Sequence, residues 1–134
     1  TLSYTYTHGE FKNSFNSSFE EWGNVKSGDE LPYIPEHQIY SSIGIETDEW
    51  LASIGGKFTD EMRTVAGSGA LNPDQSTDKS FVVDLNSEYE IVDNTRAWFS
   101  VNNLFDEDYV AARRPAGARP GAPQIVMVGL KVKF

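Results

Sequence analysis

The chain has 134 residues, contains no cysteine and carries a formal net charge of −9. These features exclude a disulfide framework and a thiolate metal site, and the acidity argues against nucleic acid as a partner. No apolar run approaches the roughly 18 residues that a membrane-spanning helix needs, whereas a barrel strand exposes only alternate residues to lipid and keeps the mean hydropathy low.

The first predicted strand covers residues 1–7, where Leu and Tyr side chains share one face and Ser and Thr side chains the other. The alternation changes phase near Gly9, which predicts a β-bulge. A long polar loop with Asn, Ser and Gly follows over residues 16–35. Because the sequence begins inside an alternating strand, we expect the chain to be a fragment of a larger protein.

Two further strands are predicted at residues 38–46 and 50–59, where apolar and polar residues alternate. Residues that pair across a hairpin share a face, so the loop between these strands must contain an even number of residues. Residues 47–48 satisfy this condition and predict a tight turn. Residues 65–79, with several Gly, Asn and Pro residues, then form a second long loop.

The last three strands are predicted at residues 81–91, from Arg96 onward, and at residues 124–134. The phase between the first two of them requires an odd loop, which residues 93–95 supply. A third long connection spans residues 111–123. In the final strand, Val, Leu and Phe side chains occupy alternate positions up to the last residue, which is typical of a barrel strand in lipid.

Long and short connections therefore alternate between six strands, which is typical of an antiparallel up-and-down transmembrane β-barrel. In such barrels the short turns are periplasmic, so the phase predicts that the three long loops are extracellular and that Phe134 lies at the periplasmic rim. Six strands are too few to close a single-chain barrel. The fold class is accordingly all-β, with six strands of a larger barrel.

Two segments near the C-terminus carry a family resemblance: Asn-Leu-Phe-Asp followed by Tyr within residues 101–109, and the Arg, Pro and Gly residues of 113–123 before a strand that closes on Phe134. The chain resembles the C-terminal end of TonB-dependent outer-membrane receptors, closest to the ferric-citrate type. Residues 31–37 and 61–64 extend the resemblance to about residues 31–134. One departure is Gln124, where the family usually has Arg.

The resemblance implies that residues 1–134 are the C-terminal part of the barrel domain, the last six strands of a probable 22-strand barrel without its plug and earlier strands. It also implies transport of a ferric chelate, a siderophore or iron citrate, across the outer membrane of a Gram-negative cell. The implied partners are outer-membrane lipid, the rest of the receptor, a TonB-type energy-transducing protein acting through the absent plug, and the barrel assembly machinery. No covalently bound cofactor is expected.

Arginine residues are the candidate ligand-binding groups. Residues 109–134 hold five basic residues and no acidic one, and Arg113, Arg114 and Arg119 cluster in the last long loop, with Arg63 a weaker candidate. Guanidinium groups bind carboxylates through paired hydrogen bonds, which suits capture of an anionic iron chelate. The alternatives are packing within the loop and contact with lipopolysaccharide phosphates.

Charged residues of the inward face form a second group. Asp84, Glu88 and Glu90 lie on a strand between those that bear Lys57 and Arg96, so mutual ion pairing along the lumen wall is favoured over direct substrate contact.

The last strand also carries an expected assembly signal, formed by Phe134, Val132 and Leu130, because the resemblance implies that the terminal aromatic residue is read during assembly.

His8 and His37 lie apart, without carboxylates or cysteines at ligand spacing, so neither a metal site nor a catalytic site is predicted. We therefore expect a transport protein and no enzyme. The alternative is a soluble β-sandwich binding module, in which the same alternation would face a core.

Overall fold

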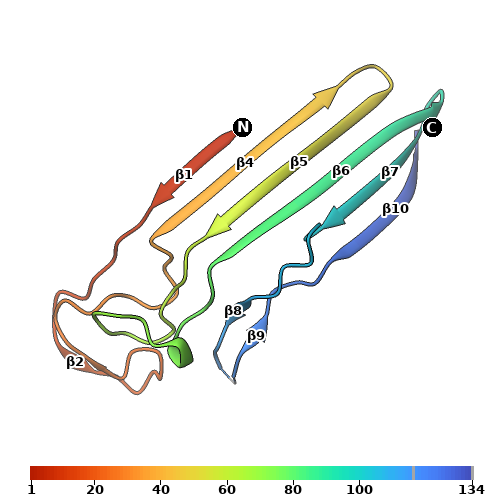
Figure 1. The fold of residues 1–134 in the computed structure, drawn as a ribbon. Coiled ribbons are helices and arrows are strands. Elements are labelled where there is room, and N and C mark those ends of the chain that lie inside the picture. Colours follow the sequence, from red (N-terminus) through yellow and green to blue (C-terminus); the bar gives the residue numbers. More distant parts are fainter. Residues whose placement is uncertain (116, 134) are drawn as a thin grey trace.

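The computed structural model describes residues 1–115 and 117–133, so Ala116 and the predicted assembly residue Phe134 lie outside the described part. Its centre is a six-stranded antiparallel sheet in the order β1-β4-β5-β6-β7-β10 (Figure 1). The strands of this sheet are β1 (Leu2–Tyr6), β4 (His37–Glu46), β5 (Trp50–Thr59), β6 (Ser80–Val92), β7 (Thr95–Asn102) and β10 (Ile125–Val132). The predicted antiparallel up-and-down arrangement is confirmed, although the six strands do not close a barrel.

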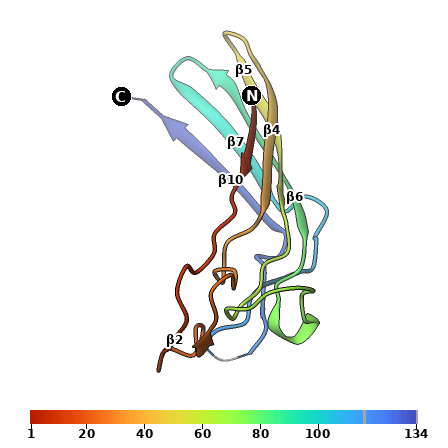
Figure 2. The same ribbon diagram turned by 90° about the vertical axis from the view of Figure 1, so that its left-hand side faces the viewer.

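Short elements occupy the long connections. They are β2 (Phe15–Asn16), β3 (Asn24–Val25), the 3-10 helix η1 (Pro73–Gln75), β8 (Val110–Ala112) and β9 (Arg119–Pro120). All long connections lie at one end of the sheet, and the short turns lie at the other end (Figure 1). In the turned view the sheet is curved, and β10 diverges from β4 and β5 at the end with the short turns (Figure 2).

The pairing register places apolar side chains together on one face of the sheet. Ile43 lies opposite Ile54, which lies opposite Leu85, and Leu85 lies opposite Val101. We call this side the apolar face; it consists of the even-numbered residues of β1, β5 and β10, the odd-numbered residues of β4 and β7, and the odd-numbered residues of β6 as far as the register shift after Glu90. The acidic residues that the sequence analysis placed on the inward face, Asp84, Glu88 and Glu90, lie on the opposite side of the sheet.

The apolar face is largely uncovered. The exposed fraction is 74% for Ile43, 72% for Val128 and 68% for Leu130, and among the described residues only Val25, Val83 and Val101 form a buried apolar core. The two small sheets, β2–β3 and β8–β9, belong to the long loops and do not form the second layer of a sandwich. Such a face matches lipid better than water, because a soluble monomer rarely exposes so large a continuous apolar patch.

The opposite side of the sheet, the polar face, pairs its charges. Arg96 Nη2 lies 3.0 Å from Glu90 Oε2, and Lys131 Nζ lies 3.9 Å from Glu88 Oε2. The predicted ion pairing along this wall is therefore observed for Glu90 with Arg96, whereas Glu88 pairs with Lys131 of β10 in place of Lys57. Asp84 differs, since its Oδ1 accepts a hydrogen bond of 2.9 Å from the backbone N–H of Asn103.

The turn between β4 and β5 differs from the predicted two-residue loop at residues 47–48. The backbone N–H of Thr47 donates to the carbonyl of Trp50 at 2.7 Å, and the Thr47 hydroxyl accepts from the N–H of Trp50 at 2.9 Å. The tight turn is therefore centred on Asp48 and Glu49. The shift preserves the faces because the pairing moves by two positions along the partner strand.

The turn between β6 and β7 also differs from the predicted three-residue loop. Val92 pairs with Thr95, so the loop contains two residues, and Asn94 adopts a left-handed backbone with φ of 63°. A register shift between Glu90 and Val92 supplies the extra residue that the phase requires. The predicted odd parity is thus produced by a bulge beside a two-residue turn.

The phase change near Gly9 does not mark a bulge within the sheet. β1 ends at Tyr6, and the chain then leaves the sheet, with the Gly9 carbonyl accepting a hydrogen bond from the N–H of Leu31 at 3.0 Å.

The described residues include no helix with the length and apolarity needed to cross a membrane.

Candidate functional site

Three long loops gather at one end of the sheet: loop 1 (residues 7–36), loop 2 (residues 60–79) and loop 3 (residues 103–124) (Figure 1). Backbone hydrogen bonds join loop 1 to loop 2, from Glu30 N to Gly67 O at 2.8 Å and from Ala66 N to Glu21 O at 2.7 Å. Loop 2 joins loop 3 through Asp78 N and Val110 O at 3.1 Å. Most buried residues, including Val25, also lie in these loops.

Asn103 organises loop 3 where the chain leaves β7. The residue is 2% exposed, and its side chain donates to the carbonyls of Glu107 and Ala122 at 3.0 and 2.9 Å and accepts from Glu107 N at 2.9 Å. Its backbone has φ of 52°, in the left-handed region that Asn adopts more readily than most residues. The Asn of the Asn-Leu-Phe-Asp motif therefore ties the start of loop 3 to its end.

Asp106 and Gln124 complete this connection. Asp106 Oδ1 accepts from Gln124 N at 2.9 Å, and Gln124 Nε2 donates to the Leu104 carbonyl at 2.8 Å. Gln124, the position that departs from the usual family pattern, thus holds the motif against the start of β10. The motif is visible in the sequence as a family resemblance, but its structural role is not, because hydrogen bonds between residues about twenty positions apart leave no periodic signal.

Arg63 lies at the junction of loops 1 and 2, with 9% of the residue exposed. Its Nε lies 2.7 Å from Glu30 Oε2, and its Nη2 donates to the Gly69 carbonyl at 2.9 Å. The guanidinium is thus engaged on two sides within the protein. This geometry favours a role in holding the two loops together.

The three arginines of loop 3 have different surroundings. Arg113 is half-buried, and its Nε donates to the carbonyl of Ser76 in loop 2. Arg114 Nη1 forms an ion pair with Glu20 Oε2 of loop 1, at 2.5 Å. Arg119 is exposed on β9, opposite Ala112 of β8, so the hairpin brings it back beside the other two. The three arginines of the predicted cluster therefore lie in the same hairpin of loop 3, but they differ in how far their side chains are already engaged by other parts of the protein.

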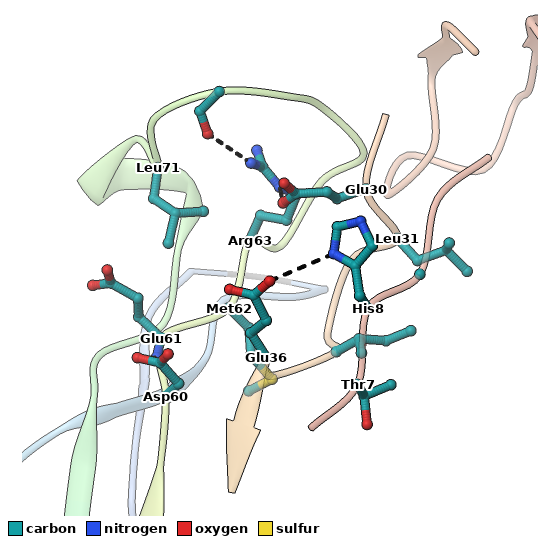
Figure 3. Close-up of a pocket in the computed structure, with 13 residues that line it drawn as sticks. Thr7, His8, Glu30, Leu31, Glu36, Asp60, Glu61, Met62, Arg63 and Leu71 are labelled. Carbon is teal, nitrogen blue, oxygen red and sulfur yellow. Dashed lines mark hydrogen bonds and ion pairs between the residues drawn. The ribbon is translucent and has the colours of Figure 1, made fainter. Parts of the chain in front are cut away.

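A cavity of about 220 Å³ lies between loop 1 and loop 2 (Figure 3). Its polar lining is mostly acidic, with His8 and Arg63 as the basic groups; the carboxylates come from Glu30, Glu36, Asp60 and Glu61. An anionic ligand is disfavoured there by the surplus of carboxylates. Within the part of the chain that the structure describes, no three His, Asp or Glu side chains come together as a metal site.

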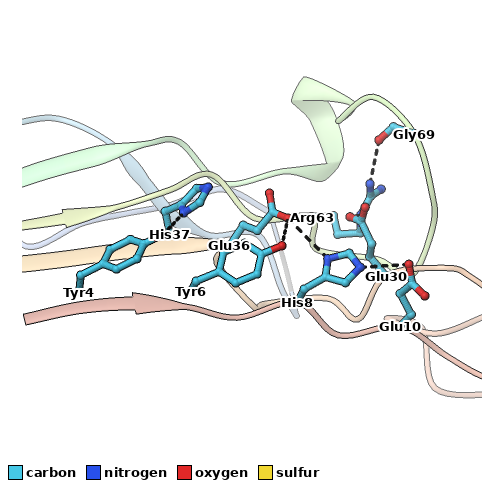
Figure 4. A network of polar contacts seen from close by, with 9 residues as sticks. All are labelled: Tyr4, Tyr6, His8, Glu10, Glu30, Glu36, His37, Arg63 and Gly69. Atoms are coloured by element: carbon cyan, nitrogen blue, oxygen red, sulfur yellow. Dashed lines mark hydrogen bonds and ion pairs between the residues drawn. The ribbon is translucent and has the colours of Figure 1, made fainter.

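His8 borders this cavity and bridges two carboxylates (Figure 4). Its Nε2 lies 3.0 Å from Glu10 Oε1, and its Nδ1 lies 3.5 Å from Glu36 Oε1. The hydrogen bond to Glu10 raises the pKa of His8, opposed by desolvation and aided by the charges of Glu10, Glu36 and Glu30. Because the folded pKa is raised, the contact stabilises loop 1 fully below the unfolded pKa and is lost as pH rises through the folded pKa.

Loop 1 also contains an aromatic cluster that was not predicted from the sequence. Trp22 packs edge-on against Phe11, Phe15 and Phe19, with ring centroids 5.5 to 5.9 Å apart. The three Phe residues are spaced by four positions in the sequence, which could have indicated that they lie together. This spacing does not fit the alternation that predicts strands. The cluster gives this polar loop a small apolar core of its own.

The comparisons with known proteins agree with this architecture. No protein-family model matches the chain. The catecholate siderophore receptor Fiu of Escherichia coli K12 is 31% identical over 108 residues, which cover 78% of this chain and 14% of the receptor. The chain is similar to part of a siderophore receptor. It spans about one seventh of that relative, and the same receptor from other Escherichia coli strains matches equally.

Two solved structures of the ferric-catecholate import receptor Fiu from Escherichia coli K12 also match. The closed form gives a TM-score of 0.74 at 27% identity over 98% of this chain and 18% of that chain. The open form gives a TM-score of 0.65 at 31% identity over 77% of this chain and 16% of that chain. Both structures are of one receptor, which is named for catecholates, so the ferric-citrate type expected from the resemblance has no support here.

Proposed function

We propose that this chain is a barrel-wall segment of a TonB-dependent outer-membrane receptor that imports a ferric catecholate. The observation that carries the proposal is the open sheet with one uncovered apolar face, matched over 98% of its length by a ferric-catecholate import receptor. Lipid would cover that face, and the rest of the receptor would supply the plug, the earlier strands and the contact with a TonB-type protein. Assembly machinery would read the final strand, including Leu130, Val132 and Phe134.

The orientation follows from the two ends of the sheet. Loops 1, 2 and 3 would be extracellular, and the turns at residues 47–50 and 93–94 periplasmic, because barrels of this kind have long outer loops and short periplasmic turns. The ligand would then meet the loops first. A soluble sandwich module is disfavoured, since no second sheet among the described residues covers the apolar face.

The anionic chelate would be captured at loop 3. Catecholate oxygens carry negative charge, and guanidinium groups bind such oxygens through charge-assisted hydrogen bonds. Arg119 is exposed, and the described side-chain contact of Arg114 is with the exposed Glu20, so we take these two arginines as the most accessible to a solute. Arg113 and Arg63 would mainly position the loops, because each donates to a backbone carbonyl of loop 2. Lipopolysaccharide phosphate is the competing ligand chemistry for this loop.

The test is binding of an iron(III) tris-catecholate complex to the full-length receptor that contains this chain, purified in detergent. Changing Arg114 and Arg119 to Gln removes two charge-assisted contacts, so the dissociation constant is expected to rise roughly tenfold to hundredfold. Lys replacements should recover only part of the loss, because an ammonium group keeps the charge without the paired donors.

A matched control removes two positive charges from loop 1, by K12Q and K26Q. This variant should bind almost as tightly as the parent if loop 3 captures the chelate. If the two double variants weaken binding of the chelate equally, the effect comes from the overall charge of the loops. If the receptor with R114Q and R119Q binds as tightly as the parent, loop 3 is not part of the ligand site. Binding of lipopolysaccharide, measured in parallel, separates the two anion chemistries.

A further inference from the structure

We propose that Glu20 is an internal competitor for the ligand: its carboxylate occupies Arg114, and an anionic chelate must displace it before it binds loop 3. The inference rests on the proposed function and adds a specificity-determining residue to it. It assigns to loop 1 a role that the sequence pattern did not suggest, because Glu20 and Arg114 are 94 positions apart.

Of the two arginine–glutamate ion pairs between the loops, the pair of Arg114 with Glu20 is more accessible to solvent than the pair of Arg63 with Glu30. The Arg63 side chain is 10% exposed, and its Nε and Nη2 are engaged by Glu30 and Gly69. The Glu20 side chain is 73% exposed, and the Arg114 side chain 28%. A solute can therefore reach the Arg114 pair without unfolding the junction of the loops.

The chemistry of the displacement is an exchange of one oxygen anion for another. A carboxylate oxygen and a catecholate oxygen both accept hydrogen bonds from a guanidinium, so Glu20 presents the kind of atom that the ligand would present. An exposed ion pair contributes little free energy, which makes its carboxylate replaceable. A chelate with several oxygens also reaches the exposed Arg119, which the hairpin β8–β9 places near Arg114. Glu20 has a single carboxylate and therefore loses this competition.

The competition has a consequence for selectivity. A weak anion with a single carboxylate gains nothing by replacing Glu20, because it exchanges one charge-assisted contact for an equivalent one. A multivalent chelate gains additional contacts and displaces the residue. Glu20 therefore raises the threshold for binding at loop 3 and favours highly charged ligands over simple carboxylates.

The experiment measures binding of the iron(III) tris-catecholate complex to the full-length receptor and to its E20Q and E21Q variants. E20Q frees Arg114, and affinity is expected to rise about two- to fivefold, the range that an exposed ion pair supports. E21Q is the matched control, because it removes the same charge from the neighbouring residue, whose contact within the described part of the chain is a backbone hydrogen bond from Ala66 N to its carbonyl. Its affinity should stay close to that of the parent.

A double-mutant cycle assigns the effect to the pair. The gain from E20Q should disappear when R114Q is already present, because no guanidinium is then released. Equal affinity of E20Q and the parent, equal gains in E20Q and E21Q, or a gain that persists with R114Q would each overturn the competition. If R114Q and R119Q weaken binding while E20Q has no effect, the proposed function stands and only the competition fails. A parent receptor that does not bind the complex overturns both.

Discussion

At the scale of single residues, the most consequential group is the Asn103 side chain. It satisfies two carbonyls and one N–H of loop 3 while its own backbone occupies a left-handed conformation. A buried amide with this many partners is costly to remove, because each of its former partners is then left without a hydrogen bond at a buried position. The motif Asn-Leu-Phe-Asp therefore has a physical role in shaping the loop.

Changing Asn103 to Ala should loosen loop 3. We expect a loss of about 2 kcal/mol or more of local stability, since three hydrogen bonds of the side chain disappear. The measurement is amide hydrogen exchange of residues 103–124 in the full-length receptor, where protection should fall. Asn102 is the control, because its side chain has no hydrogen bond to the described residues, and N102A should leave exchange in loop 3 near the parent value. Equal protection in N103A and the parent would contradict this role.

At the scale of elements, the alternation of residues predicts the strands and their faces but not the details of the turns. All six main strands begin within one residue of their predicted starts, and β1, from Leu2 to Tyr6, is one residue shorter than predicted at each end. Parity fixes only whether a loop is odd or even, so it could not distinguish residues 47–48 from Asp48–Glu49, nor a three-residue loop from a bulge. Capping by Thr47 and the left-handed Asn94 decide those cases.

The loops were less predictable than the strands for the same reason. The arginine cluster of loop 3 was visible in the composition, but the partners of the arginines were not. Glu30 pairs with Arg63 across 33 positions and Glu20 with Arg114 across 94, and no local pattern encodes such contacts. Ligand contact at Arg63, Arg113, Arg114 and Arg119 stays a prediction.

Gly129 offers a test of how β10 packs on β7. A Cβ atom at this position would lie 2.5 Å from Trp98 Nε1, so the indole lies across the glycine on the polar face. Changing Gly129 to Ala should displace the indole and cost about 1–3 kcal/mol. Thermal unfolding of the full-length receptor in detergent measures the loss, and Trp98→Leu should make the same change less costly. An equal cost in both backgrounds would show that the clash does not involve Trp98.

At the scale of the whole molecule, the two ends of the sheet differ in the length of the connections between strands. One end holds tight turns of two residues, and the other holds three loops that contain most of the buried residues. The asymmetry agrees with a wall that separates an outer surface from the periplasm. It also makes the proposed orientation testable without knowledge of the ligand.

A broad-specificity protease added to intact cells should cut the receptor within residues 16–35 or 65–79, if it cuts anywhere. It should not cut at residues 47–50 or 93–94, because these turns would face the periplasm. Mass spectrometry of the released peptides locates the cuts, and permeabilised cells serve as the control in which the turns become accessible. Cleavage at either turn in sealed cells would reverse the orientation.

The bonds between the loops have a further consequence. Loop 1 holds loop 2 through Arg63 and Glu30, loop 2 holds loop 3 through Ser76 and Arg113, and loop 3 returns to loop 1 through Arg114 and Glu20. The three contacts form a closed ring, in which each loop restrains the other two. The exposed pair of Arg114 with Glu20 is the weakest of the three contacts, so displacement of Glu20 would open the ring there and leave loop 2 as the link between the other two loops.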